Sequence, residues 1–417
     1  MEKKENLKVV FLSINVFGTT IGGVENHIYY LSKELASMGI KVDIVQPIPN
    51  DKNSFEVVSF GSITLHKLYL KVPFYSLFKG IEKFHSDTKF GMLLAFVNKF
   101  KCIFCAKEIA KYIETLSPDI IHQHDYISNI FTTKILSKKF KTVLTNHTGE
   151  YLILSKIFLT RKIQEKLLSH FDFVIGPSRE LTPKQRNALY IPNGVDIDFF
   201  YPLGEEEIKL KKRKMGYNGE FVILCPRRWA PTKGIIYLAK AIKLLDGELP
   251  RNVVFLFAGS DYEGYQEYRK KVNSILSSCS AKVRNLGNLD QLTLRNFYQI
   301  SDLTVIPSLM EATSLAALEA MACGCPILST NVGGMPEIIR EDYNGWMVEP
   351  MSDVVLANKI KELYEILKNQ RRKREIRKNC REFVVEQYDW GRIAEKTVEI
   401  YNKLMEKKNN DKENPNY

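Results

Sequence analysis

Short apolar runs alternate with helix-like patterns along most of the chain. Val9 to Ile14 is apolar at almost every position, which is typical of a parallel β-strand buried on both faces. A glycine-bearing loop follows. From Val24 the apolar spacing becomes that of a helix, and Gly39 stands where a C-terminal cap belongs. Val42 to Val45 is again a strand pattern, so the segment predicts a β-α-β unit.

The alternation continues and then restarts. Turn-forming residues from Ile191 to Asp196 and a charged run from Glu205 to Lys214 interrupt it, which places a domain boundary near residue 200. The predicted strands before the boundary are Ile120 to His124, Thr142 to Asn146 and Phe173 to Ile175; those after it are Phe221 to Cys225, Val253 to Ala258, Leu303 to Ile306 and Pro326 to Ser329. Helical patterns beyond the boundary cover Ile235 to Leu245, Glu263 to Ser277 and Ser314 to Ala322.

We therefore predict an α/β protein with two Rossmann-like, doubly wound domains, residues 1–200 and 201–390, that face each other across a cleft. Residues 391–417 are expected to form a C-terminal helix that packs back on the first domain, followed by a frayed tail. Ligands of open α/β sheets bind outside the carboxyl ends of the strands, so chemistry is expected in the loops that follow them.

Composition narrows the class of protein. The chain has 417 residues, 45% of them hydrophobic and 26% charged, which excludes collagen-like and globally disordered chains. Seven cysteines without framework spacing favour a reducing compartment, hence the cytoplasm. Acidic residues in the opening segment argue against a signal peptide, and no apolar run reaches the roughly 18 residues of a spanning helix. A net charge of +12 favours anionic partners.

A pair of acidic residues marks the densest candidate site. Glu311 lies in the loop before a predicted helix, and Glu319 lies about one and a half turns inside that helix. Ser314 or Thr313 would cap the helix, whose first amides and dipole of roughly +0.5 charge attract an anion. By themselves the two acids also fit an ordinary surface pair.

A basic loop strengthens the anion-binding interpretation. Arg227, Arg228 and Lys233 occupy one predicted strand-to-helix loop. Arginine offers a fork that matches phosphate oxygens, and lysine offers a mobile point charge. Gly333-Gly334 brings bare backbone amides to another helix start. The alternative for the three cations is an ordinary exposed basic loop, and the alternative for the glycine pair is a plain tight turn.

At this point the residues resemble a family, the retaining, nucleotide-sugar-dependent glycosyltransferases of the GT-B fold (glycosyl transferases group 1 or family 4 type). The resemblance covers nearly the whole chain. Its most specific part is the Glu311-x7-Glu319 arrangement, preceded by Pro-Ser and followed by Val332 to Glu337. The other matching segments are Gly22 to His27, Pro118 to Asp125, Ile191 to Asp196, and Arg228 with Lys233-Gly234.

The resemblance implies a hexosyltransferase that moves a sugar from a UDP- or GDP-sugar to a lipid-linked or saccharide acceptor and retains the anomeric configuration, with no metal or other cofactor. It also implies a role in cell-surface polysaccharide or glycolipid synthesis. Arg228 and Lys233 would hold the diphosphate, and Glu319 would bind the ribose. Gly22 and Gly23 would let the backbone of the first domain approach the diphosphate.

The catalytic residues implied by the resemblance are Glu311, which would meet the hydroxyls of the donor sugar, and His124, which would lie beside the transferred sugar. Many relatives have Gly-Phe-Gly directly after the first glutamate, where this chain has Ala-Thr-Ser. Because the family uses backbone amides there, Thr313, Ser314 and Leu315 would still bind the donor, although Thr313 could alter which sugar fits.

The chemistry of the reaction agrees with these residues. Breaking a sugar–diphosphate bond leaves negative charge on the departing phosphate, so cations and amides belong beside it and no metal is required. Asp196-x-Asp198 and a cluster of His122, His124 and His147 are imaginable metal sites, but no ligand pattern completes either of them. The Cys102-x-x-Cys105 and Cys323-x-Cys325 pairs are expected to be buried thiols.

Other functions stay open at this point. A glycosidase could use Glu311 and Glu319 as its carboxylate pair, although it would not need a basic loop. An NAD-dependent oxidoreductase is disfavoured because no Gly-x-Gly-x-x-Gly follows the first strand. A non-catalytic nucleotide-sugar binder would differ from the enzyme only in turnover.

Basic and aromatic residues interleave between Ser62 and Thr115, with Phe74, Phe78 and Ile81 on one predicted helix face. Such a helix could lie on an anionic membrane at the inner face of the cell membrane, or could be an ordinary domain helix with a cationic rim. The basic run Arg371 to Arg374 fits a solvated helix face, and no motif accompanies it that would indicate nucleic-acid binding.

Overall fold

The structure is a computed structural model that describes residues 7–16, 22–73, 75–76, 99–147, 151, 158–184, 187–259 and 265–413. The chain forms two compact units. The first contains the described residues up to Asn193 and those from Trp390 onward, and the second runs from Gly194 to Asp389. The chain changes unit before the expected boundary at residue 200, because Ile191 packs in the core of the first unit and Val195 in that of the second.

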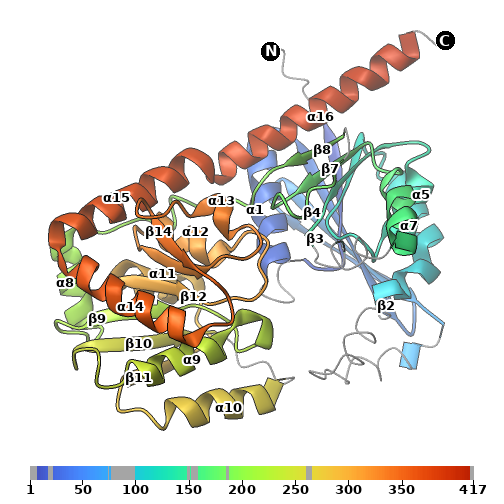
Figure 1. Cartoon of the computed structure of the whole chain (residues 1–417). Coiled ribbons are helices and arrows are strands. Elements are labelled where there is room, and N and C mark those ends of the chain that lie inside the picture. The colour runs from blue at the N-terminus through green and yellow to red at the C-terminus, as the bar shows by residue number, and fades with distance from the viewer. Residues whose placement is uncertain are drawn as a thin grey trace. The chain divides into compact units, whose positions relative to one another are not determined.

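The first unit is built on a sheet with strand order β3-β4-β2-β1-β5-β6-β7-β8 (Figure 1). All neighbouring strands are parallel except β3 and β4. The strands are β1 (Lys8–Leu12), β2 (Lys41–Asn50), β3 (Ser54–Phe60), β4 (Ile63–Lys71), β5 (Ile120–Gln123), β6 (Lys141–Thr145), β7 (Phe173–Gly176) and β8 (Ala188–Tyr190). The helices are α1 (Gly23–Ser37), η1 (Lys99–Cys105), α4 (Ala106–Thr115), α5 (Ile130–Leu136), α7 (Phe158–Leu168) and α16 (Trp390–Glu413).

The apolar pattern of β1 predicted a parallel strand buried on both faces, and Val9 to Leu12 are indeed completely buried between β2 and β5. β3 and β4 were not predicted from the sequence. The side chains of β3 are exposed on both faces, since it is an edge strand, and so it carries no buried apolar run.

The last helix, α16, packs against α1 in the first unit. Ile393, Ala394 and Tyr401 are buried in the same core as Ile28 of α1. The Tyr401 hydroxyl also lies 2.6 Å from Nδ1 of the buried His122. Residues more than 270 positions apart in sequence therefore share one core.

The second unit has an all-parallel sheet of order β11-β10-β9-β12-β13-β14. The strands are β9 (Phe221–Cys225), β10 (Val253–Ala258), β11 (Lys282–Gly287), β12 (Leu303–Ile306), β13 (Ile327–Thr330) and β14 (Gly345–Val348). The helices are α8 (Glu205–Lys214), η2 (Pro231–Lys233), α9 (Ile235–Leu244), α10 (Gln266–Leu276), α11 (Gln291–Ile300), α12 (Leu315–Ala322), α13 (Met335–Ile338), α14 (Asp353–Lys368) and α15 (Gln370–Gln387).

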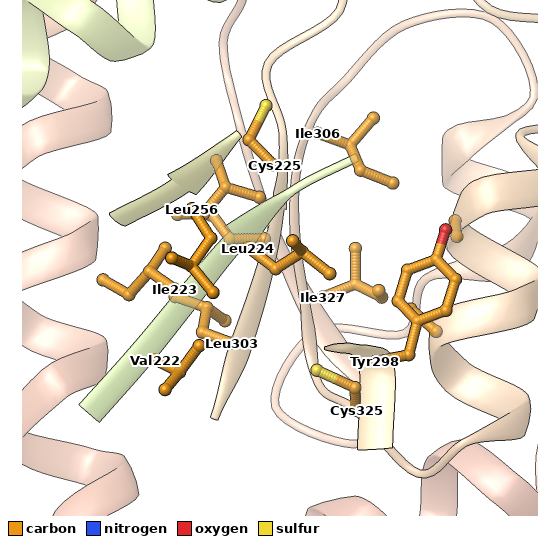
Figure 2. Packing of buried hydrophobic residues seen from close by; sticks show 14 of the residues in the cluster. Val222, Ile223, Leu224, Cys225, Leu256, Tyr298, Leu303, Ile306, Cys325 and Ile327 are labelled. Carbon is orange, nitrogen blue, oxygen red and sulfur yellow. The ribbon is translucent and has the colours of Figure 1, made fainter. Parts of the chain in front are cut away.

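The core of the second unit forms around the central strands. Figure 2 shows Ile223 and Leu224 of β9 among side chains from the neighbouring strands, with Tyr298 entering from α11. Phe221 to Cys225 are all buried, as expected for a central parallel strand covered by helices on both faces.

The predicted fold class is confirmed, because both units are α/β and built on parallel, Rossmann-like sheets. Within the described part of the chain, no helix combines the length and the hydropathy needed to cross a bilayer. The amphipathic helix expected around Phe74 to Lys83 lies outside the described residues.

Candidate functional site

Loops of the second unit meet at the carboxyl ends of β9, β12 and β13. The Leu309 amide donates a hydrogen bond of 2.8 Å to the Thr232 carbonyl, which joins the loop after β12 to the loop after β9. The Gly334 amide donates one of the same length to the Ala312 carbonyl, which adds the loop after β13. The basic loop, the first glutamate and the glycine pair found in the sequence are thereby brought to one edge of the sheet.

Two glycines make this close approach of the loops possible. Gly234 has a φ of +65°, and a Cβ there would overlap the carbonyl oxygen of Pro307. Gly333 has a φ of +54°, and a Cβ there would overlap the carbonyl oxygen of Glu311. Only glycine combines this left-handed backbone conformation with so close a contact.

Glu311 lies at the centre of an ion cluster. Its Oε1 accepts hydrogen bonds from Lys233 Nζ and from Ser308 Oγ, each of 2.8 Å. The Arg227 guanidinium pairs with the same oxygen. The Glu311 side chain is only 7% exposed, so this carboxylate is removed from water and is engaged by its basic partners instead.

Arg227 is the arginine of this loop that joins the cluster, and Arg228, which is predicted to hold the diphosphate, lies outside it. Arg227 is buried and also donates to Ser314 Oγ at 3.4 Å, whereas Arg228 is exposed. Both arginines stand in the loop identified from the sequence, and their order in that loop gave no signal that separated the buried one from the exposed one.

The cations of the cluster influence one another. Burial lowers the pKa of Lys233, and the nearby charges of Arg227 and Arg228 act in the same direction. The Glu311 carboxylate, 2.8 Å away, favours the charged form of the lysine. Burial likewise lowers the pKa of Arg227 to about 10. Two basic side chains pair with one carboxylate, and the exposed Arg228 stands next to Arg227 in the chain, so the loop carries a formal excess of positive charge that a bound anion would relieve.

Glu319 has a different environment. It lies within α12, where its Oε2 accepts a hydrogen bond of 3.1 Å from the hydroxyl of the buried Tyr298. Removal from water raises the pKa of Glu319 to about 7, against the opposing effects of Tyr298 and Arg227. Tyr298 was not identified from the sequence, because nothing in the pattern of α11 separates this tyrosine from an ordinary core residue.

The start of α12 adds backbone donors to the site. Ser314 is the N-cap, but its hydroxyl does not cap the helix and instead accepts from Arg227. Thr313 is also buried, and Leu315 is the first residue of the helix. The helix therefore begins beside the ion cluster, with its positive dipole end at the same place as the basic side chains.

The remaining predicted site residues belong to the first unit. Gly22 is the N-cap of α1 and Gly23 its first residue; a Cβ at Gly23 would meet nothing within 4 Å. His124 follows β5, and its amide donates a 2.9 Å hydrogen bond to the carbonyl of Leu12 at the end of β1. Its buried ring lies against Phe11, with centroids 4.4 Å apart.

The other residues that the sequence suggested as metal ligands either take part in local structure or are buried. Asp196 Oδ1 accepts a hydrogen bond from the Phe199 amide and so stabilises a turn. Cys102 and Cys105 are buried in η1, and both are free thiols. Cys323 and Cys325 are also buried and free, as expected.

A hollow lies at the opposite, amino-terminal edge of the sheet in the second unit. It has a volume of about 850 Å³, and Lys212, Lys373 and Arg377 contribute to its lining. Lys212 and Lys373 pair with the buried Asp302, and Arg377 donates to the carbonyl at the end of α11. None of the predicted donor-binding residues, all of which the structure describes, lines this hollow, so we place the site at the ion cluster.

The chain was compared with known protein families. Residues 21–199 match the family model described as Glycosyltransferase Family 4, and residues 207–383 match the model described as Glycosyl transferases group 1. The first match covers residues of the first unit up to Asn193 and the first six residues of the second unit, and the second match falls within the second unit.

Similar proteins include an uncharacterised glycosyltransferase of Methanocaldococcus jannaschii, 27% identical over 93% of this chain and 95% of the relative. The phosphatidylinositol N-acetylglucosaminyltransferase GPI3 subunit of Saccharomyces cerevisiae is 26% identical over 93% of this chain and 81% of its own. Among solved structures, sucrose-phosphate synthase from Thermosynechococcus elongatus matches with a TM-score of 0.74 at 22% identity, over 96% of this chain and 99% of that one.

A second solved structure, Anabaena HepE in complex with UDP and glucose, matches with a TM-score of 0.67 at 17% identity, over 95% of this chain and all of that one. The structural matches show the fold, and the family models and relatives show the class of enzyme. The chain belongs to the glycosyltransferases of the GT-B fold, with a family 4 domain followed by a group 1 domain.

Proposed function

We propose that this chain transfers a hexose from a nucleoside diphosphate sugar to a lipid-linked or saccharide acceptor and retains the anomeric configuration. The observation that carries the proposal is the ion cluster of the second unit, where Arg227 and Lys233 surround Glu311. A diphosphate is the anion that this arrangement of fork-shaped and point-like cations fits best.

The cluster supplies what the reaction needs on the phosphate side. As the bond between the anomeric carbon and the phosphate oxygen breaks, negative charge grows on the leaving diphosphate. Lys233, Arg227 and the first amides of α12 would stabilise that charge without having to reorganise. In this role Arg228, which is exposed next to the cluster, would contact the outer face of the diphosphate.

The proposal assigns the rest of the donor to the other predicted residues. Glu319, held by Tyr298, would bind the ribose, and Glu311 would meet hydroxyls of the sugar. His124 would lie beside the transferred sugar, with Gly22 and Gly23 near the diphosphate. These assignments follow from the family resemblance, and the buried, prepositioned carboxylates of the second unit support them.

Named relatives support the choice of ligands. The yeast relative is named for transfer of N-acetylglucosamine to phosphatidylinositol, and the Anabaena structure holds UDP and glucose. We therefore include a lipid-linked acceptor and a UDP-sugar among the candidate ligands, with GDP-sugars as the alternative donor. A role in cell-surface polysaccharide or glycolipid synthesis would use such an acceptor.

The diphosphate assignment is tested by calorimetric titration of UDP and GDP into the parent and into Lys233→Ala. We expect about 10- to 100-fold weaker binding of the preferred nucleotide to the variant, because a hydrogen bond to a charged group contributes about 1.5–3 kcal/mol. Lys243→Ala is the control, since Lys243 is an exposed lysine in the last turn of the adjacent α9. Equal affinity of parent and Lys233→Ala for UDP and for GDP would contradict the assignment.

Retention is tested on the product. We expect NMR of the newly formed glycosidic bond to show the same anomeric configuration as in the donor sugar. Inversion would remove the retaining assignment while leaving the diphosphate site intact. The same assay separates transfer from simple binding, because a non-catalytic nucleotide-sugar binder would form no product.

Peripheral contact with an anionic membrane is part of the proposal on sequence grounds alone, as is a cytoplasmic location. Phe74, Phe78 and Ile81, the apolar residues that suggest such contact, lie outside the described residues. Flotation with vesicles rich in anionic phospholipid at low salt is expected to carry the protein upward. Flotation with neutral vesicles is the control, and no difference between the two would remove this part of the proposal.

A further inference from the structure

Four of the seven histidines of the chain lie together inside the first unit. His27 belongs to α1 and His122 to β5, His124 directly follows β5, and His147 lies two residues after β6. His122 is fully engaged: Nδ1 lies 2.6 Å from the Tyr401 hydroxyl and Nε2 lies 2.7 Å from the Thr145 hydroxyl. His27 and His124 each have a ring nitrogen without a hydrogen-bond partner among the described residues.

His27, His124 and His147 each offer a ring nitrogen, and these three atoms lie within 4.8 Å of one another. Nε2 of His27 and Nε2 of His124 are buried and have no hydrogen-bond partner among the described residues. Burying such an acceptor without a partner costs free energy, so each of these nitrogens is suited to a ligand that the protein alone does not supply.

Asn193 prepares His27 for such a ligand. Its Oδ1 lies 2.8 Å from His27 Nδ1, and an amide oxygen can only accept, so Nδ1 carries the proton. The lone pair of His27 is therefore on Nε2, the nitrogen without a partner. An outer hydrogen bond that fixes the tautomer of a histidine is the usual support of a metal-binding imidazole.

The surroundings of the rings also suit a cation ligand. His27 and His124 are buried, and neutral imidazole is the form that binds metals. Nδ1 of His124 and Nε2 of His147 are 3.5 Å apart, a long contact that constrains the two rings little.

We propose that His27, His124 and His147 bind one Zn²⁺, Co²⁺ or Ni²⁺ ion through three imidazole nitrogens, with a further position open to water or another ligand. Zinc–nitrogen bonds of about 2.0–2.1 Å hold tetrahedral ligands about 3.3 Å apart, so the rings would move inward slightly on binding. Three imidazoles without a carboxylate select such ions over Mg²⁺ or Ca²⁺.

This set differs from the one that the sequence suggested. His122 stands next to His124 in the pattern, but its two nitrogens are already bonded within the core. His27 comes from a helix about 100 residues earlier and takes its place. The proposed site lies within one unit and shares His124 with the proposed sugar site; the metal titration needs no donor sugar and so tests it separately from the transfer reaction.

The test is a titration of the full-length protein with Co²⁺ under reducing conditions, followed by visible absorption. We expect one Co²⁺ per chain with ligand-field bands and without the near-ultraviolet charge-transfer band of thiolate ligation, because the free cysteines are not part of the set. Zn²⁺ should displace the Co²⁺ and raise the unfolding temperature of the parent.

His27→Gln and His147→Gln are each expected to weaken Co²⁺ binding at least tenfold. The control is His170→Gln, which removes a partly exposed histidine of the same unit that is not in the set and should leave the titration unchanged. His147 is less buried than His27, so its variant gives a readout if His27→Gln fails to fold. Absence of Co²⁺ bands in the parent, a thiolate band, or equal affinity in His147→Gln would overturn the proposal.

Discussion

At the scale of single residues, the two glutamates of the candidate site have opposite electrostatic settings. Glu311 pairs with Lys233 and Arg227, whereas Glu319 accepts a hydrogen bond from the neutral hydroxyl of Tyr298. Burying a charged carboxylate with one neutral hydrogen-bond donor lowers the free energy of unfolding of the protein. Such a cost is expected where the residue serves a ligand rather than the fold.

Glu319→Gln is therefore predicted to stabilise the protein at alkaline pH. The folded-state pKa of about 7 lies above the ordinary value of 4.5, so the folded state holds a proton that the unfolded state has lost. This group makes the free energy of unfolding fall as pH rises from about 4.5 to 7. The variant removes that loss, which amounts to at most about 3 kcal/mol at pH 8 and little at pH 5.

Urea unfolding of parent and variant at pH 5 and pH 8 measures the effect. The control is Glu386→Gln, which changes an exposed glutamate of the same unit. A variant that is no more stable than the parent at pH 8 would show that Glu319 is not strained by burial. If Glu319 binds the ribose as proposed, the stabilised variant should also bind the donor nucleotide more weakly.

At the scale of elements, the site exists because loops after separate strands fit together. The loop between β9 and α9 reaches the loop after β12 through Gly234, and the loop after β13 reaches it through Gly333. Neither helix α12 nor strand β9 could bring Lys233 to Glu311 without these contacts. The geometry of the ion cluster is therefore a property of the packed loops.

Gly234→Ala should disrupt this packing. Its Cβ would overlap the carbonyl oxygen of Pro307, and the residue would also have to keep a φ of +65°. We expect a loss of about 3 kcal/mol or more in unfolding free energy, together with weaker nucleotide binding, because strain and overpacking add.

Gly247→Ala is the matched control, since Gly247 also has a positive φ, of +82°, but a Cβ there would meet nothing within 4 Å. Gly247→Ala should lower the unfolding free energy by only about 1 kcal/mol, which is the cost of holding alanine at a positive φ. Chemical denaturation of both variants gives the comparison. Equal losses in the two variants would mean that backbone conformation alone, and not the approach of the loops, explains the glycine at position 234.

At the scale of the whole molecule, the chain leaves the first unit at Asn193 and returns to it at Trp390. The second unit is continuous in sequence and has its own core. The core of the first unit is shared between its N-terminal part and α16, through residues such as Ile393 and Tyr401. The two units should therefore differ in their ability to fold as fragments.

We predict that a fragment of residues 194–389 unfolds cooperatively, whereas a fragment of residues 1–193 does not. Without α16 the apolar face of α1 is uncovered, and His122 loses its hydroxyl partner from Tyr401. Thermal melts and binding of a hydrophobic dye measure the difference. Addition of residues 390–413 through a flexible linker should restore a cooperative melt to the first fragment, and a failure to do so would contradict the prediction.

The sequence by itself determined the fold class, the central strands and the loops that carry the candidate site. Buried parallel strands such as Phe221 to Cys225 and Val253 to Ala258 are apolar throughout, so their pattern is visible without any partner. The edge strand β3 was missed because it buries no face and so leaves no such pattern.

Only the tertiary structure decided which side chains act together. Position in a loop is local information, but the direction of a side chain depends on what packs against it, which is why Arg227 turns inward and Arg228 outward. Tyr298 beside Glu319, and His27 beside His124 and His147, join elements distant in sequence. Hydrophobic patterning follows from each segment alone, whereas such contacts arise only when separate segments pack together.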